Sequence, residues 1–166
     1  TFRFSVTSDS HVNIMLGVAS TWQQTLSNIA TESPDFHLDL GDTFAMDNVT
    51  TQTGADAAYR FQRSSSYFGA IGHSTSLFLA VGNHEQEEGW HLDDNTDPLK
   101  SPPVMGTNAR KKYFPNPVPD AFYSGNTDTY ASLDGDHLHE DYYAWQWGDA
   151  LFIVIDPFWY TTAKPF

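Results

Sequence analysis

The sequence predicts an α/β fold built around a parallel sheet. Three short apolar runs, Phe2–Thr7, Phe36–Leu40 and Leu77–Val81, have the length and composition of strands. Two segments with helical periodicity, 14–33 and 54–71, separate these runs. A strand–helix–strand–helix–strand order favours right-handed crossovers, which place neighbouring strands parallel in one sheet.

Each predicted helix has an apolar stripe and a stop signal. In 14–33 the stripe recurs at steps of four, four and three, and Pro34 follows: Val18, Trp22, Leu26, Ile29. In 54–71 the steps are four, three, four and three, and Gly72 follows: Ala57, Phe61, Ser64, Phe68, Ile71. Both segments are therefore expected to pack one face on the sheet.

The second strand alternates between two faces. Phe36, Leu38 and Leu40 share one face, whereas His37 and Asp39 share the other. The His37 side chain points away from the end of the strand, so we interpret His37 as a packed strand residue and not as a ligand.

The rest of the chain divides into a loop-rich insertion and a hairpin. Residues 86–140 are rich in proline and acidic residues and have little periodicity, so we expect an insertion within one partial domain over 1–166. Within it, His137-Leu138-His139 is interpreted as a surface loop in the acidic stretch 134–141, and Arg110-Lys111-Lys112 as a solvated patch. Tyr142–Trp147 and Ala150–Ile155, joined by Gly148-Asp149, predict a hairpin.

Composition excludes several classes of protein. The formal charge of −13 argues against general nucleic-acid binding, because a phosphate backbone requires a basic surface. The absence of cysteine excludes disulfides, thiolate metal sites and cysteine nucleophiles. No apolar run is long enough for a membrane span. The acidic surface weakly favours a periplasmic or extracellular setting, and a leader could have preceded residue 1.

Side chains that bind metals follow each predicted strand. The three clusters are Asp9-Ser10-His11, Gly41-Asp42 and Gly82-Asn83-His84-Glu85. In an open α/β sheet the carboxyl ends of parallel strands meet at one edge, where ligands bind. The three clusters are therefore expected to form one site.

Taken in order, these clusters resemble the calcineurin-like metallophosphoesterase superfamily, whose motifs read D-x-H, G-D and G-N-H-[DE]. The resemblance covers about the first 85 residues and, more loosely, the hairpin. It implies part of a four-layer α/β/β/α sandwich, with the C-terminal half absent from this chain. It also implies hydrolysis of a phosphomonoester or phosphodiester in a phosphorylated small-molecule substrate.

The resemblance implies a dinuclear centre of Mn, Fe or Zn ions, which would neutralise the phosphate oxygens. Asp9 and His11 would bind the first ion, Asp42 would bridge the two, and Asn83 would bind the second. His84 would not be a ligand; it would donate a proton or hydrogen bond to the leaving group. Glu85 would lie behind the ligands and orient His84.

Alternatives remain open at this stage. Family members carry a further histidine and a G-H-x-H element, which this chain lacks, so it could be a non-catalytic remnant or binding module that retains a half-site. Taken singly, Asp9 fits a helix N-cap, Asp42 a turn and Asn83 a left-handed turn residue. Purple acid phosphatases have a tyrosine where this chain has Ala45, so their ferric–tyrosinate centre is not expected, although the Gly-Asn-His-Glu motif is theirs.

Overall fold

Three parallel strands form the central sheet, in the order β1-β2-β3. The computed structural model describes residues 1–125, 127–133, 135 and 137–165. Strand β1 spans Phe4–Thr7, β2 spans Phe36–Asp39 and β3 spans Ser76–Leu79. Each strand lies inside or next to the run predicted for it, and the pairing is parallel throughout.

Helix α1, Ala19–Glu32, begins five residues later than the sequence predicted. Residues before it form a loop in which Val12 bridges to Gly17. The loop folds tightly on itself, since a Cβ on Gly17 would lie 2.3 Å from the His11 carbonyl. Trp22 and Leu26 of the predicted stripe are buried, so the helix face was correct although its start was wrong.

Helix α2, Gln52–Gln62, covers only the first half of the second predicted helix. Its start is capped by Thr51, whose hydroxyl accepts from the Gly54 N–H at 3.1 Å. The second half turns through a run of serines into a 3-10 helix at Phe68–Ala70. Phe68 and Ile71 of the predicted stripe are buried in the core. The stripe was wrong at Ala57, Phe61 and Ser64, which are exposed, because α2 turns Ala55, Tyr59 and Gln62 inward instead.

Helix α3, Pro102–Tyr113, lies in the segment predicted to be loop-rich. Short 3-10 helices also occur there, at Gly89–His91 and Pro98–Lys100. The prediction failed because α3 is buried around nearly its whole circumference, including polar Thr107 and Arg110. A helix of this kind has no apolar stripe for a periodicity search to find.

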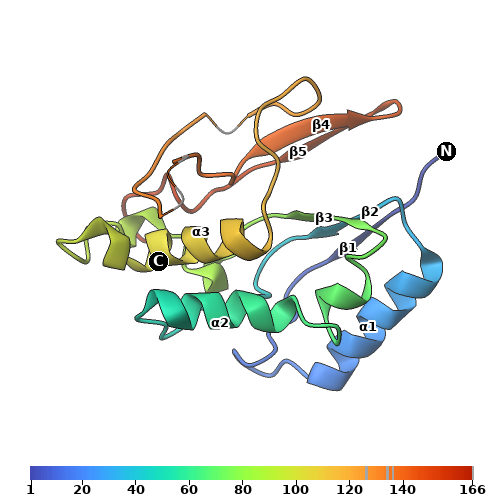
Figure 1. Cartoon of the computed structure of the whole chain (residues 1–166), viewed down its shortest axis with the longest axis horizontal. Coiled ribbons are helices and arrows are strands. Elements are labelled where there is room, and N and C mark those ends of the chain that lie inside the picture. The colour runs from blue at the N-terminus through green and yellow to red at the C-terminus, as the bar shows by residue number, and fades with distance from the viewer. Residues whose placement is uncertain (126, 134, 136, 166) are drawn as a thin grey trace.

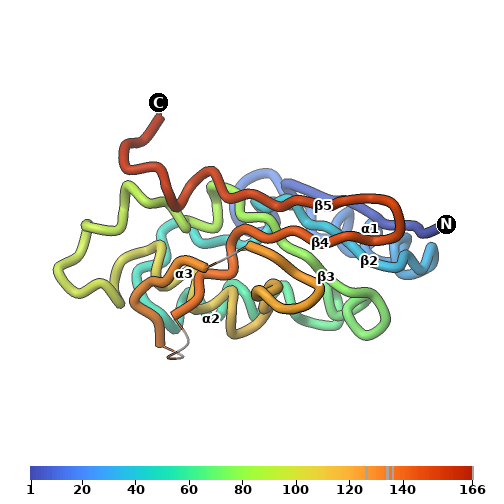
Figure 2. The backbone as a smooth tube through the Cα atoms, turned by 90° about the horizontal axis from the view of Figure 1, so that it is seen from above, coloured from blue at the N-terminus to red at the C-terminus, as the bar shows by residue number. Residues whose placement is uncertain are grey.

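The hairpin prediction is confirmed. Strand β4, Tyr143–Trp147, pairs antiparallel with β5, Ala150–Val154. Figures 1 and 2 show this hairpin lying over the face of the sheet opposite α1 and α2. The α/β class is confirmed, and the described residues form a helical layer, a parallel sheet and a two-stranded second sheet. They do not include a fourth layer.

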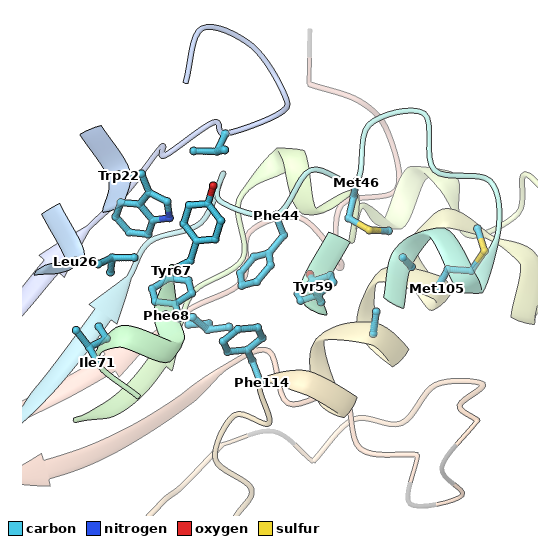
Figure 3. Close-up of a cluster of buried hydrophobic side chains, with 14 residues drawn as sticks. Trp22, Leu26, Phe44, Met46, Tyr59, Tyr67, Phe68, Ile71, Met105 and Phe114 are labelled. Atoms are coloured by element: carbon cyan, nitrogen blue, oxygen red, sulfur yellow. The ribbon is translucent and has the colours of Figure 1, made fainter. Parts of the chain in front are cut away.

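Two hydrophobic clusters hold these layers together. The cluster between the helices and the sheet is built largely on aromatic rings, including Phe44 stacked on Tyr59 at 4.2 Å between ring centroids (Figure 3). The cluster between the two sheets centres on Trp145, which stacks on Phe78 at 4.3 Å. Among the described residues no helix is both long and apolar enough to cross a membrane.

Candidate metal centre

The loops that follow β1, β2 and β3 meet at one edge of the sheet. The Asp9 N–H donates to the Gly41 carbonyl at 3.0 Å, and the His11 N–H donates to the Asp42 carbonyl at 3.2 Å. Gly41, with φ +93°, lies so close to the third loop that a Cβ on it would be 2.3 Å from the Gly82 nitrogen. Only a glycine fits there.

Glu85 fixes two of these loops from behind. Its buried carboxylate accepts hydrogen bonds of 2.7–2.9 Å from four backbone N–H groups: those of Gly82, Asp42, Thr43 and Phe44. Burial raises the pKa of Glu85 to about 7, although these hydrogen bonds act in the opposite direction. Glu85 thus lies behind the predicted ligands and binds backbone N–H groups of their loops, and its role in orienting His84 stays a prediction.

Three side chains converge in front of this backbone frame. His11, Asp42 and His84 each place one possible ligand atom within 4.8 Å of the others. His11 Nε2 lies 3.7 Å from an oxygen of Asp42 and 3.7 Å from an oxygen of Asp9. This nitrogen is buried and has no hydrogen-bond partner in the described part of the chain. We call His11, Asp42 and His84 the strand-end cluster.

Backbone strain is concentrated in the same loops. Asp9, His11 and Asp42 have φ values of +56°, +48° and +56°. Left-handed conformations in residues other than glycine cost about 1–3 kcal/mol each and occur preferentially at functional sites. These left-handed residues therefore lie in the same loops as the converging side chains of His11 and Asp42.

His84 is held by a residue that the sequence did not indicate. Its Nδ1 lies 2.8 Å from an oxygen of Asp47, and its backbone N–H donates to Asp42 at 2.9 Å. Burial lowers the pKa of His84, but the hydrogen bond and charge of Asp47, with Asp42, outweigh it, so the pKa is raised overall. Asp47 belongs to no motif, and its distance in sequence from His84 gives no signal of the contact.

The two remaining predicted ligands lie at the rim. The Asp9 side chain is 58% exposed, and Asn83 begins the 3-10 helix Asn83–Glu85 with an exposed side chain. Both follow directly on the strand ends, as predicted. Their roles as ligands stay predictions, whereas His11, Asp42 and His84 are brought together by the fold.

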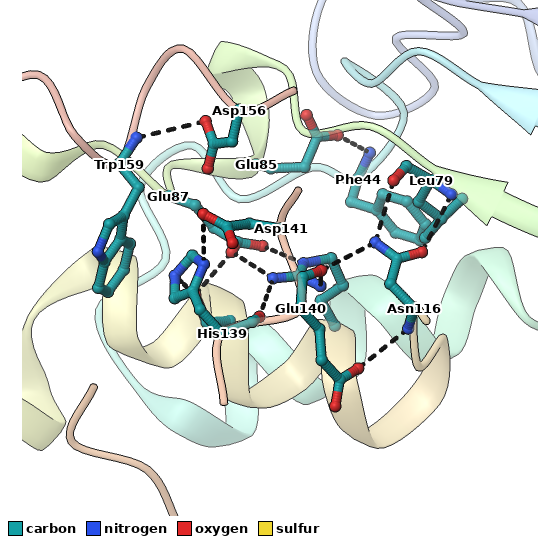
Figure 4. Close-up of polar contacts among 12 residues, drawn as sticks. Phe44, Leu79, Glu85, Glu87, Asn116, His139, Glu140, Asp141, Asp156 and Trp159 are labelled. Carbon is teal, nitrogen blue, oxygen red and sulfur yellow. Dashed lines mark hydrogen bonds and ion pairs between the residues drawn. The ribbon is translucent and has the colours of Figure 1, made fainter. Parts of the chain in front are cut away.

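A second polar region lies between α3 and the hairpin and corrects two predictions (Figure 4). The basic triplet is not a solvated patch: Arg110 is buried and makes a bidentate pair with Glu87 at 2.8 and 3.0 Å. Lys111 is also buried and donates to the Leu138 carbonyl at 2.6 Å. Lys112, which pairs with Asp56, fits the prediction, since its side chain is exposed.

The interpretation of His137-Leu138-His139 as a surface loop is wrong at its second histidine. His137 is exposed, but His139 and the nearby Asp141 are buried. Asp134 and Asp136 of the acidic stretch lie outside the described residues. The error arose because acidic composition normally indicates a solvated face, and burial of this segment depends on contact with α3.

No family model, no curated protein and no solved structure matches this chain. The metals that suit the strand-end cluster therefore follow from the donor atoms of its own residues. Imidazole and carboxylate donors without thiolates suit Zn, Mn or Fe better than soft metals. The buried, unpartnered His11 nitrogen facing two carboxylates has the donor arrangement that a divalent cation fits.

Proposed function

We propose that this protein hydrolyses phosphate esters, monoesters or diesters, with metal ions bound by Asp9, His11, Asp42 and Asn83 and with His84 beside them. The observation that carries the proposal is the convergence of His11, Asp42 and His84, from three separate motifs, within 4.8 Å. An accidental arrangement would require metal-binding side chains after three separate strands and also their convergence on one point.

Asp9, His11 and Asp42 would hold the first ion, and Asp42 and Asn83 would contribute to the second. Bound metal ions would neutralise the phosphate oxygens as Lewis acids and help to activate water. Asp42 suits a shared ligand because one oxygen is fixed by the His84 N–H at 2.9 Å while the other faces His11. With so few donors, we expect the chain alone to bind at most one ion weakly at this cluster.

His84 would act as the proton donor to the leaving group. Asp47 occupies Nδ1, so the proton would leave from Nε2. The raised pKa keeps a larger fraction of the imidazole protonated near neutral pH, as a general acid requires. Asp47 would orient the ring and maintain that pKa.

An exposed apolar strip along β1 and β5 fits a larger enzyme, as the resemblance implies. Its side chains are 45–69% exposed: Phe4, Val6, Leu40, Leu151, Ile153 and Ile155. Further protein packed on this strip would also be the expected source of the remaining ligands.

The test is hydrolysis of p-nitrophenyl phosphate and bis(p-nitrophenyl) phosphate by the full-length gene product, with Mn²⁺, Zn²⁺ or Fe²⁺. We expect metal-dependent turnover of at least one ester and none in Asp42→Ala. A correctly folded protein that is inactive with all three metals would exclude this function.

The second candidate is a non-catalytic module that binds a metal ion or phosphate without turnover. The exposure of Asp9 and Asn83, which leaves few enclosed donors, favours it. The sequence of the gene beyond Phe166 separates the two. A downstream G-H-x-H element supports the enzyme, whereas a stop codon supports the module.

A further inference from the structure

A second group of possible ligands is buried between α3 and the hairpin, away from the strand-end cluster. His139, Asp141 and Asp156 each place one ligand atom within 4.8 Å of the others. The exposed fractions of these three residues are 1%, 0% and 8%. His139 and Asp141 precede β4, and Asp156 follows β5. We call these three residues the buried cluster.

Hydrogen bonding fixes the tautomer of neutral His139. The Thr107 hydroxyl donates its single proton to the Glu87 carboxylate at 2.6 Å. Its 3.2 Å contact with His139 Nε2 must then be one in which the imidazole donates. Neutral His139 therefore carries its proton on Nε2 and presents a lone pair at Nδ1. A metal-binding histidine usually donates its other ring N–H to a nearby acceptor, as Nε2 does here to the Thr107 hydroxyl.

The Nδ1 lone pair faces a carboxylate. It lies 2.8 Å from an oxygen of Asp141, with which the imidazole pairs when it is protonated, and no other group in the described residues contacts Nδ1. With neutral His139 these two electron-rich atoms repel each other, so either a proton or a metal ion has to lie between them.

Asp156 directs an unpartnered oxygen to the same place. One oxygen, Oδ1, accepts from the N–H groups of Phe158 and Trp159 at 2.6 and 3.3 Å. The other, Oδ2, is buried without a hydrogen bond in the described residues and points toward His139 and Asp141 (Figure 4). A buried, unpartnered carboxylate oxygen is costly, and such groups are normally paired or bound to a metal.

The local charge does not balance. Arg110 attracts Asp141, but its guanidinium is bound to Glu87 and to the carbonyls of His139 and Glu140. Arg110 is thus largely committed to Glu87, Asp141 is paired with the His139 imidazole, and Asp156 Oδ2 has no hydrogen-bond partner in the described residues.

We propose that the buried cluster is a structural site for a divalent transition-metal ion, bound by His139 Nδ1 and the carboxylates of Asp141 and Asp156. The imidazole favours Zn²⁺ over Mg²⁺ or Ca²⁺, which prefer oxygen alone. The ion would join the segment before β4 to the segment after β5. Because its ligands are buried, it would stabilise the fold and would not meet substrate.

The test uses the full chain, freed of metal with a chelator, and compares thermal unfolding with and without Zn²⁺. We expect Zn²⁺ to raise the unfolding midpoint of the unmodified protein, because a ligand that binds only the folded state stabilises it. Most of the rise should be lost in Asp156→Asn and His139→Gln, with only the weak effect of the strand-end cluster left, and Mg²⁺ should not produce a comparable rise. The Zn²⁺ affinity measured by titration should fall by about 10-fold or more in both variants.

Two controls separate this site from the strand-end cluster and from simple misfolding. Asp42→Asn should keep the rise with Zn²⁺, as should His37→Gln, which changes a buried histidine elsewhere. Without metal, Asp156→Asn should fold at least as stably as the unmodified protein, since it removes a buried charge and keeps Oδ1 as an acceptor. An equal Zn²⁺ effect in Asp156→Asn, loss of the effect in Asp42→Asn, or no effect in the unmodified protein would overturn the proposal.

Discussion

The strand-end cluster and the buried cluster contain similar donors in different surroundings. Each brings imidazole and carboxylate groups within 4.8 Å. At the strand ends the His11 and Asp42 side chains are 23% and 17% exposed, whereas His139 and Asp141 are at most 1% exposed. An open cluster can admit a substrate and a closed one can only bind an ion. Access, more than donor chemistry, separates a proposed catalytic site from a proposed structural one.

His37 shows that burial alone does not make a histidine a ligand. The Ser5 hydroxyl contacts its Nδ1 at 2.8 Å, and the Thr7 hydroxyl contacts its Nε2 at 2.9 Å. Thr7 gives its proton to Asp39, so His37 donates from Nε2 and accepts at Nδ1. Both nitrogens are satisfied, in contrast to His139, and the predicted packing role of His37 is confirmed.

The largest expected effect tests the proposed role of His84 in the strand-end cluster. His84→Asn in the full-length protein should lower turnover by about 10²- to 10⁴-fold while metal content is kept, because general-acid help is lost. The loss should shrink for esters with good leaving groups, which need no proton. Kinetics on two esters, together with metal analysis, measure both effects. If the variant loses metal as fully as Asp42→Ala, His84 is a ligand.

The second-largest expected effect tests how the buried pair of Arg110 and Glu87 contributes to stability. Arg110→Ala leaves Glu87 buried without its partner and should lower the free energy of unfolding by about 3–5 kcal/mol. Urea denaturation of the variant and of the unmodified protein measures this change in the free energy of unfolding. Lys112→Ala is the matched control, since that side chain is exposed and should matter little. Equal effects of the two changes would contradict the buried pairing.

A pH dependence sharpens the contrast between the two buried histidines. Burial lowers the pKa of His37 to about 4, below its ordinary 6.5. The unfolded chain therefore takes up a proton that the folded chain does not, and stability present above about pH 6.5 is lost as the pH falls toward 4. The loss attributable to His37 should be about 3 kcal/mol.

The measurement is urea unfolding at pH 7 and pH 4 for the unmodified protein and for His37→Gln. Other groups titrate in both proteins, among them Asp39, whose pKa burial raises to about 7, so the difference between the two proteins is the relevant quantity. A difference that does not change with pH would show that His37 is not protected from protonation in the fold.

The smallest expected effect concerns Asp47, the partner of His84. Asp47→Asn should lower turnover by about 10- to 100-fold, as is usual for a group that orients a catalytic residue. It should also lower the pKa of His84, so activity should decline at a lower pH on the alkaline side of the profile. An unchanged pH profile would show that Asp47 does not control the His84 proton.

The sequence anticipated the strand-end cluster better than the buried one. His11, Asp42 and His84 follow apolar runs in short motifs, so local patterns and the geometry of parallel sheets were enough to bring them together. Asp47 was missed because no motif contains it. His139 and Asp156 were missed because their meeting depends on how the hairpin packs over α3.

By itself, the sequence determined the α/β class, the three strand ends and the hairpin, because these depend on local periodicity and on turn residues. Only the tertiary structure decided the burial of α3, of Arg110 and of His139. Such polar residues carry no signal of burial in a local window, since their partners lie far along the chain: Glu87 precedes Arg110 by 23 residues. Hydrogen bonds and charge pairs across that separation make burial possible, and they form only when the layers pack.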